Sequence, residues 1–140
     1  MRVYVYPMDL GGCGYYRLIW PAKVLQSQGY DVRLVHPNTQ RKISGGTDDS
    51  GRLVSINIPN DADVMVFQRL TSKFIIDGID IMRQNGIAVV MDLDDDVCAI
   101  NPNNVAFNVL HPGRGPAEYN WANTRRAAQK VTMMTVSTPE

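Results

Sequence analysis

Short apolar runs alternate along the chain with segments of helical periodicity. Runs rich in β-branched and aromatic residues predict strands, and apolar residues every three or four positions predict helices. The predicted helices cover residues 15–28, 71–85 and 116–130. The predicted strands lie at residues 3–6, 31–35, 53–58, 63–67, 87–92 and 131–136. Strands alternating with helices predict an α/β fold, a Rossmann-like, doubly wound, mostly parallel sheet of about six strands with helices on both faces.

Turn and loop signals divide the predicted elements. Pro21 lies within the first predicted helix, so either the helix kinks there or its regular part begins near Trp20 with Pro21 in the first turn. Residues 38–52 and 99–115 are polar and rich in Gly, Pro or Asn, which predicts two long loops. The length of 140 residues predicts a single domain over residues 1–140.

Composition and charge exclude several classes of protein. The 14 basic and 14 acidic residues cancel, so no global basic field favours nucleic acid. Cys13 and Cys98 lie far apart and neither belongs to a Cys-x-x-Cys pair, which predicts a reduced, cytoplasmic setting rather than a disulfide framework. No apolar run approaches the ~20 residues that a membrane span needs, so no membrane span is expected.

An acid cluster, Asp92, Asp94, Asp95 and Asp96, ends the apolar strand at residues 87–92. Ligands bind at the carboxyl ends of strands in open parallel sheets, and like charges this close need a cation, a substrate or water. Three interpretations stay open. The cluster could hold Mg²⁺ or Mn²⁺ against a diphosphate, one aspartate could be a general base for a sugar hydroxyl, or the run could be a solvated strand end.

A second candidate is the glycine-rich turn Gly11-Gly12-Cys13-Gly14 after the first predicted strand. Its backbone N–H groups either bind an anion at a helix start or simply form a tight turn. It is not the dinucleotide-binding fingerprint, because Arg17 stands where the third glycine belongs. Arg17 itself either clamps a phosphate or carboxylate group or forms a surface ion pair.

Arg69 follows the strand at residues 63–67 and is expected at the same sheet edge as the acid cluster. It either pairs with the acid cluster or binds an anionic group of a substrate. The two histidines, His36 and His111, share no metal-ligand spacing with the cysteines, and no metal site is expected from them.

Four segments, taken in order, form a known pattern: GCGYYRLIWPAKVLQSQGYDV, DVMVFQR, GIAVVMDLDDD and VTMMTVSTPE. Together they resemble the N-terminal domain of GT-B glycosyltransferases of the retaining, family-4-like kind. They are most similar to the glycosyltransferase-like proteins of bacteriophages, which often carry an acid run after this strand. The resemblance covers nearly all of the chain and rests on the order and spacing of the segments.

The resemblance implies two Rossmann-like domains facing each other across a cleft, with transfer of a sugar from a nucleotide-sugar donor to an acceptor hydroxyl. It implies no metal and no cofactor besides the donor substrate. Asp94 stands where many relatives place a catalytic histidine, so it is the expected catalytic base. The residues expected to face the donor phosphates are Gly11, Gly12, Gly14 and Arg17. Those expected to bind the acceptor are Arg69, Asp92, Asp95 and Asp96.

The donor-binding domain of that family is absent from these 140 residues. The expected partners are therefore a nucleotide sugar, a carbohydrate or other hydroxyl acceptor, and either a separate C-terminal half or a second copy of the chain. The chain would be an enzyme only when completed by a donor-binding domain. Two other interpretations are a non-catalytic Rossmann-like module that binds a carbohydrate or a protein, and a metal-dependent phosphoryl-transfer enzyme that uses the aspartate run.

Overall fold

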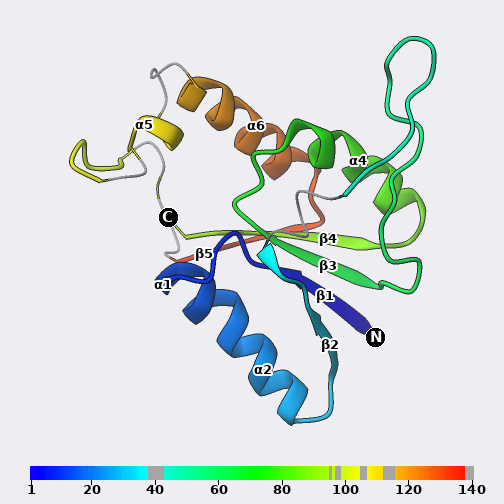
Figure 1. Ribbon diagram of the computed structural model, residues 1–140, viewed down its shortest axis with the longest axis horizontal. Coiled ribbons are helices and arrows are strands. Elements are labelled where there is room, and N and C mark those ends of the chain that lie inside the picture. Colours follow the sequence, from blue (N-terminus) through cyan, green and yellow to red (C-terminus); the bar gives the residue numbers. More distant parts are fainter. Residues whose placement is uncertain (38–42, 95, 97–98, 105–106, 112–115, 138–140) are drawn as a thin grey trace.

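The computed structural model describes residues 1–37, 43–94, 96, 99–104, 107–111 and 116–137, without the side chains of residues 109, 110 and 116–118. Its centre is an all-parallel sheet of five strands in the order β2-β1-β3-β4-β5 (Figure 1). The strands are β1 Arg2–Tyr6, β2 Asp31–Leu34, β3 Val64–Gln68, β4 Ala88–Leu93 and β5 Met133–Val136. The expected Rossmann-like α/β fold is confirmed, with five strands in the described part of the chain instead of about six.

Helices cover both faces of the sheet (Figure 1). On one face, α1 Gly12–Gly14, the single π-helical turn η1 Tyr15–Ile19 and α2 Trp20–Ser27 follow one another without a break. On the other face lie α4 Lys73–Gln84 and α6 Pro116–Lys130, with the short helix α5 Phe107–Leu110 packed beside α6. None of the described helices is long and apolar enough to cross a membrane.

The three predicted helices are confirmed, with small differences at their ends. The regular α-helical part α2 begins at Trp20, directly after the π-helical turn η1, and Pro21 lies in its first turn. This is the second of the two alternatives for Pro21. The helix α6 has the predicted bounds, whereas α5 lies in the segment 99–115 that was predicted to be a loop.

The predicted strand at residues 53–58 does not join the sheet. Its apolar residues pack on α4 instead. Ile56 lies so close to Gly78 of α4 that a Cβ atom on Gly78 would be only 2.5 Å from the Cδ1 atom of Ile56. The alternating pattern therefore belongs to an extended segment whose apolar side packs on a helix. Sequence periodicity does not distinguish such a segment from a strand of the sheet. Residues 53–58 make two isolated antiparallel bridges, Ser44 with Asn57 and Thr47 with Leu53.

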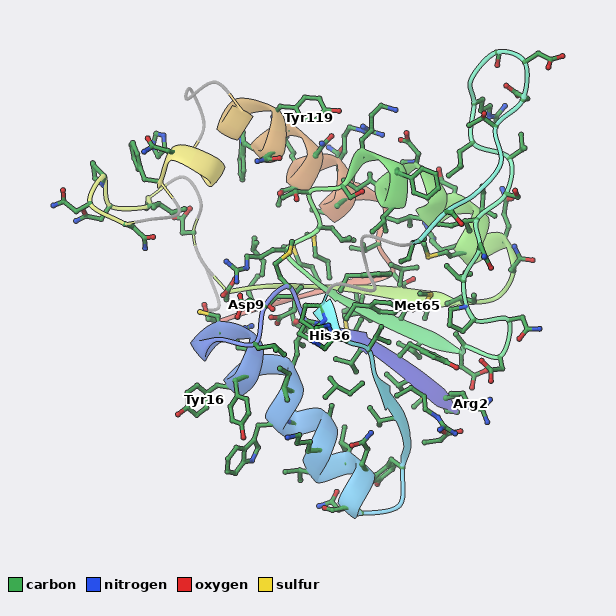
Figure 2. The ribbon with its side chains drawn as sticks, in the orientation of Figure 1. Arg2, Asp9, Tyr16, His36, Met65 and Tyr119 are labelled. Atoms are coloured by element: carbon green, nitrogen blue, oxygen red, sulfur yellow. The ribbon has the colours of Figure 1, made fainter. Side chains whose placement is uncertain are left out.

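The larger part of the core lies between the sheet and α4. Met65 and Phe67 of β3 and Met91 of β4 are fully buried there against α4 residues such as Ile79. Alternate residues of the strands face α2 in a smaller cluster. Figure 2 shows Met65 inside the molecule, whereas Tyr16, which is 73% exposed, points away from it.

The connections after β1 and β3 leave the sheet on opposite faces. The chain passes from β1 to the helices α1, η1 and α2 on one face, and from β3 to α4 on the other (Figure 1). Because β1 and β3 are neighbours in the sheet, a topological switch point lies between them. Ligands of open α/β sheets bind in the crevice that forms at such a point, outside the carboxyl ends of the strands.

Candidate functional site

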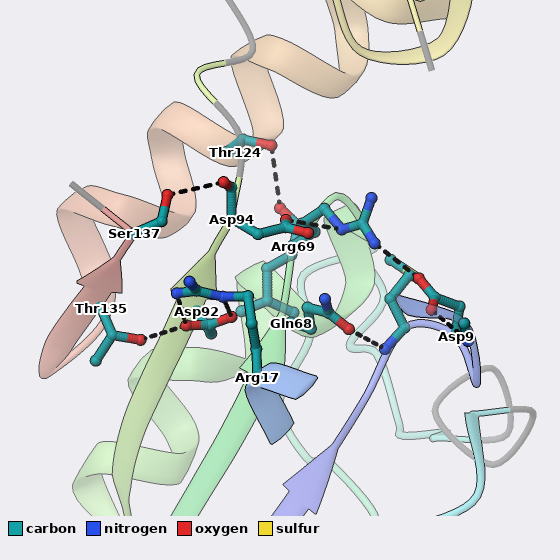
Figure 3. A network of polar contacts seen from close by, with 12 residues as sticks. Asp9, Arg17, Gln68, Arg69, Asp92, Asp94, Thr124, Thr135 and Ser137 are labelled. Carbon is teal, nitrogen blue, oxygen red and sulfur yellow. Dashed lines mark hydrogen bonds and ion pairs between the residues drawn. The ribbon is translucent and has the colours of Figure 1, made fainter. Parts of the chain in front are cut away.

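Two arginines and three aspartates meet at the carboxyl ends of β1, β3 and β4 (Figure 3). We call this set, Asp9, Arg17, Arg69, Asp92 and Asp94, the carboxyl-edge cluster. Parallel pairing brings it together, because strands that run in the same direction end at the same edge of the sheet. With three carboxylates against two guanidinium groups, these five side chains together carry a negative charge.

Arg17 of η1 and Asp92 of β4 form a two-pronged ion pair. Nε of Arg17 donates to Oδ2 of Asp92 at 2.8 Å, and Nη2 donates to Oδ1 at 2.6 Å. The hydroxyl of Thr135 also donates to Oδ1, at 2.7 Å. The hydrogen bond to Asp92 raises the pKa of Arg17 above its already high ordinary value. Of the roles considered for Arg17, the structure shows an ion pair, and it lies deeper than a surface pair because the Asp92 side chain is only 5% exposed.

Arg69 links three parts of the cluster. Its backbone N–H donates to the carbonyl of Asp92 at 2.8 Å, and its Nη2 donates to Oδ2 of Asp9 at 2.7 Å. Its Nε lies 3.2 Å from Oδ1 of Asp94, within ion-pair distance. The backbone of Arg69 has φ = 49°, a left-handed conformation that costs free energy in a non-glycine residue. Of the two alternatives for Arg69, the structure shows pairing with the acid cluster.

Asp94 is buried with most of its hydrogen-bonding capacity unused. Its side chain is 3% exposed, yet neither carboxylate oxygen accepts a hydrogen bond from any described residue. The Nε2 group of Gln68, which is fully buried at the end of β3, likewise has no partner in the described part of the chain. Each unmade hydrogen bond of this kind costs about 1–3 kcal/mol. The sheet edge thus combines open acceptors on Asp94 with an open donor on Gln68.

Asp9 closes the glycine-rich turn from within the chain. Its Oδ1 accepts a hydrogen bond from the N–H of Gly11 at 2.8 Å. A Cβ atom on Gly14 would lie 2.1 Å from the Asp9 carbonyl oxygen, so only glycine fits there, whereas nothing lies within 4 Å of a Cβ atom on Gly12. These contacts support the tight-turn interpretation for Gly11 and Gly14. The Asp9 carboxylate already accepts from the Gly11 N–H, so an anion bound at this turn would compete with Asp9 for that group.

Asp9 and Thr135 were not identified from the sequence. An aspartate two residues before a glycine is typical of an Asx turn, so the motif Asp9-x-Gly11 carried a usable signal. Thr135 carried none, since its contact with Asp92 depends on the pairing of β4 with β5.

The other candidate residues lie elsewhere or cannot be placed. Asp96 is exposed, and Asp95 lies outside the described residues. The His111 ring stacks on Phe107, with 4.4 Å between ring centroids, and is not part of the cluster. No group of three or more His, Cys, Asp or Glu side chains within the described ranges is arranged to hold a metal ion.

The cluster differs in one respect from the site that the resemblance implies. Arg17 points to Asp92 rather than standing free beside the glycine turn, so both arginines of the cluster are already paired with carboxylates of the chain. In comparisons with known proteins, no family model, no curated protein and no solved structure matches the chain.

Proposed function

We propose that the carboxyl-edge cluster binds a hydroxyl group of a carbohydrate acceptor, and that the chain is the acceptor-side domain of a GT-B glycosyltransferase. The observation that carries the proposal is the buried Asp94 carboxylate, whose oxygens accept no hydrogen bond from the described residues. A buried carboxylate that is ion-paired but accepts no hydrogen bond is expected to be completed by a ligand or water. The position at the switch point of the sheet supports a ligand.

The chemistry of the unmade hydrogen bonds favours a hydroxyl group. A hydroxyl both donates and accepts, so its chemistry matches both kinds of open group at this edge, the acceptors of Asp94 and the donor Nε2 of Gln68. The diphosphate of a nucleotide sugar offers only acceptors at neutral pH and would meet the carboxylates of Asp9, Asp92 and Asp94. The negative charge of the cluster therefore favours a neutral, hydroxyl-bearing ligand over an anionic one.

In the proposed reaction, Asp94 acts as the general base. It takes the proton of the acceptor hydroxyl as that oxygen bonds to the anomeric carbon of the donor sugar. The bond from the anomeric carbon to the diphosphate oxygen breaks, and the nucleoside diphosphate leaves with the electron pair. Arg69 holds Asp94 in position through its ion pair, and Arg17 does the same for Asp92. The donor phosphates would approach the turn at Gly11, Gly12 and Gly14 from a second domain or chain.

A second candidate is a carbohydrate-binding module without transferase activity. One observation favours it: Arg17 and Arg69, the two cations of the cluster, are both engaged by carboxylates of the chain itself. A donor diphosphate would have to displace one of these pairs or find its cations elsewhere. The two candidates share the acceptor site and differ in whether a donor is used.

Calorimetric titration tests the shared site. A panel of neutral oligosaccharides is titrated into the wild-type protein, Asp94→Asn and the matched control Asp80→Asn, which alters an exposed aspartate of α4 paired with Lys130. We expect Asp94→Asn to weaken binding about tenfold or more, equivalent to ~1.4 kcal/mol, and Asp80→Asn to leave it unchanged. Equal affinity in all three proteins would overturn the proposal, as would the absence of binding by any oligosaccharide.

Turnover separates the two candidates. Release of a nucleoside diphosphate from a nucleotide sugar such as UDP-glucose is measured with the bound oligosaccharide, using protein isolated with whatever chain co-purifies. Release that depends on the oligosaccharide and is lost in Asp94→Asn supports the transferase. Oligosaccharide binding without release supports the binding module.

A further inference from the structure

A pocket on the sheet face opposite α2 lies apart from the carboxyl-edge cluster. Its volume is about 440 Å³, within the range of roughly 300–1,000 Å³ that is typical of small-molecule sites. The side chains that matter to its chemistry are the two inward-facing tyrosines of β1, the end of β2 and the segment beyond residue 56: Tyr4, Tyr6, Val35, Asn57 and Ile58. It is a site that neither the acid cluster nor the glycine turn uses.

The walls of this pocket suit an uncharged flat ring. No Asp, Glu, Lys or Arg is among the described residues that line it. A phosphate would find no cation there, and a sugar with many hydroxyl groups would leave most of them without partners against apolar walls. An aromatic ring can instead pack on tyrosine rings and aliphatic side chains, which is favourable in proteins.

The two tyrosine rings are held in place before any ligand binds. The Tyr6 ring stacks on Phe67, with 4.7 Å between centroids and 22° between planes. The Tyr4 hydroxyl donates to Oδ1 of Asp61 at 2.9 Å. Because neither ring needs to be ordered on binding, little conformational entropy is lost when a ligand enters.

Two of the residues that line the pocket carry polar side chains. Tyr6, which is 3% exposed, carries a hydroxyl group. Asn57, an exposed residue of the same lining, carries an amide with both a donor and an acceptor. Flat apolar walls with a hydroxyl and an amide match a ring that has hydrogen-bonding groups along one edge.

We propose that this pocket binds a nucleobase, with the ring against Tyr4, Val35 and Ile58 and its polar edge bound by the Tyr6 hydroxyl and the Asn57 amide. The inference is independent of the sugar site, because it uses none of the residues of the carboxyl-edge cluster. It gives the chain a nucleoside-binding site of its own, whatever the cluster binds.

The test is an NMR titration of the isotope-labelled protein with four probes: uridine, adenosine, ribose and phenol. Ribose lacks the base, and phenol has an aromatic ring without the polar edge of a base. We expect at least one nucleoside to bind and to shift the amide signals of Tyr6 and Asn57, with phenol weaker and ribose not binding. Tyr6→Phe keeps the ring and its stacking, so this variant should fold. Its affinity for the nucleoside should fall by roughly twofold to tenfold.

Two further variants keep the result interpretable. Asn57→Ala, at an exposed position, should reduce the preference for the nucleoside over phenol. Tyr30→Phe removes the hydroxyl of a tyrosine that is 60% exposed outside the pocket and should leave affinity unchanged. The proposal is overturned if no nucleoside binds, if ribose or phenol binds as tightly, or if Tyr6→Phe and Asn57→Ala have no effect. It is also overturned if Asp94→Asn lowers the affinity for the nucleoside as much as Tyr6→Phe does, because the nucleoside would then bind at the carboxyl-edge cluster.

Discussion

The guanidinium group of Arg17 and the carboxylate of Asp92 bond to each other twice, although 75 positions separate them in the chain. The pair joins the helical segment after β1 to the carboxyl end of β4, and Thr135 connects β5 to the same carboxylate. One buried aspartate therefore fixes three elements around the switch point of the sheet.

Replacing Arg17 tests how much the fold depends on this pair. Arg17→Met leaves the Asp92 carboxylate, which is 5% exposed, with the Thr135 hydroxyl as its remaining side-chain partner among the described residues. Breaking a buried pair from one side costs about 3–5 kcal/mol, and the 24% exposure of Arg17 reduces this. We expect the free energy of unfolding, measured with urea, to fall by about 2–3 kcal/mol.

Arg33 provides the matched control for Arg17. It pairs with Asp31 while its own side chain is 58% exposed, so Arg33→Met should change stability by less than about 1 kcal/mol. The double variant Arg17→Met with Asp92→Leu should recover much of the loss, because no unpaired charge remains buried. Equal effects of Arg17→Met and Arg33→Met would contradict a structural role for the buried pair.

Gly14 and Gly12 should respond in opposite ways to the same substitution. In Gly14→Ala the new Cβ atom would meet the Asp9 carbonyl oxygen at 2.1 Å, so the Asp9 segment must move and its pair with Arg69 is disturbed. We expect a loss of about 2 kcal/mol or more. Gly12→Ala has free space around the Cβ atom within a helical turn and should raise stability by up to ~1 kcal/mol.

Thermal and urea unfolding of Gly14→Ala, Gly12→Ala and the wild type measure these changes in the free energy of unfolding. If Gly14→Ala were as stable as Gly12→Ala, Asp9 could not lie as close to the turn as described, and the tight-turn interpretation would be wrong.

Tyr6 should make stability sensitive to alkaline pH. Burial, with a smaller contribution from Tyr4, raises the pKa of Tyr6 to about 12, whereas an unfolded tyrosine ionises near 10. Because the folded pKa is the higher one, the contribution is fully present below about pH 10 and is lost as the pH rises through about 12. The urea midpoint of the wild type should therefore fall over this interval, and Tyr6→Phe should reduce the fall. Parallel pH profiles for the two proteins would show that Tyr6 ionises as readily in the folded state as in the unfolded one.

Local signals in the sequence were sufficient for most elements of the fold. Pro116 and the basic residues near Lys130 mark the two ends of α6, and Pro21 marks the first turn of α2. These signals act within one or two helical turns, so they do not depend on the rest of the chain. The placement of Arg69 near the acid cluster also followed from the sequence, because consecutive parallel strands end at a common edge.

The remaining features depended on the tertiary structure. The sequence pattern of residues 53–58 was that of a strand, and only the packing of Ile56 on Gly78 of α4 decided otherwise. The partner of Arg17, the contribution of Thr135 and the burial of Asp94 all depend on the strand order β2-β1-β3-β4-β5. Periodicity reports which side of an element is apolar, but not which element lies against it. The acid cluster could therefore be found in the sequence, whereas its one buried carboxylate without hydrogen bonds among the described residues emerged only when distant segments were packed together.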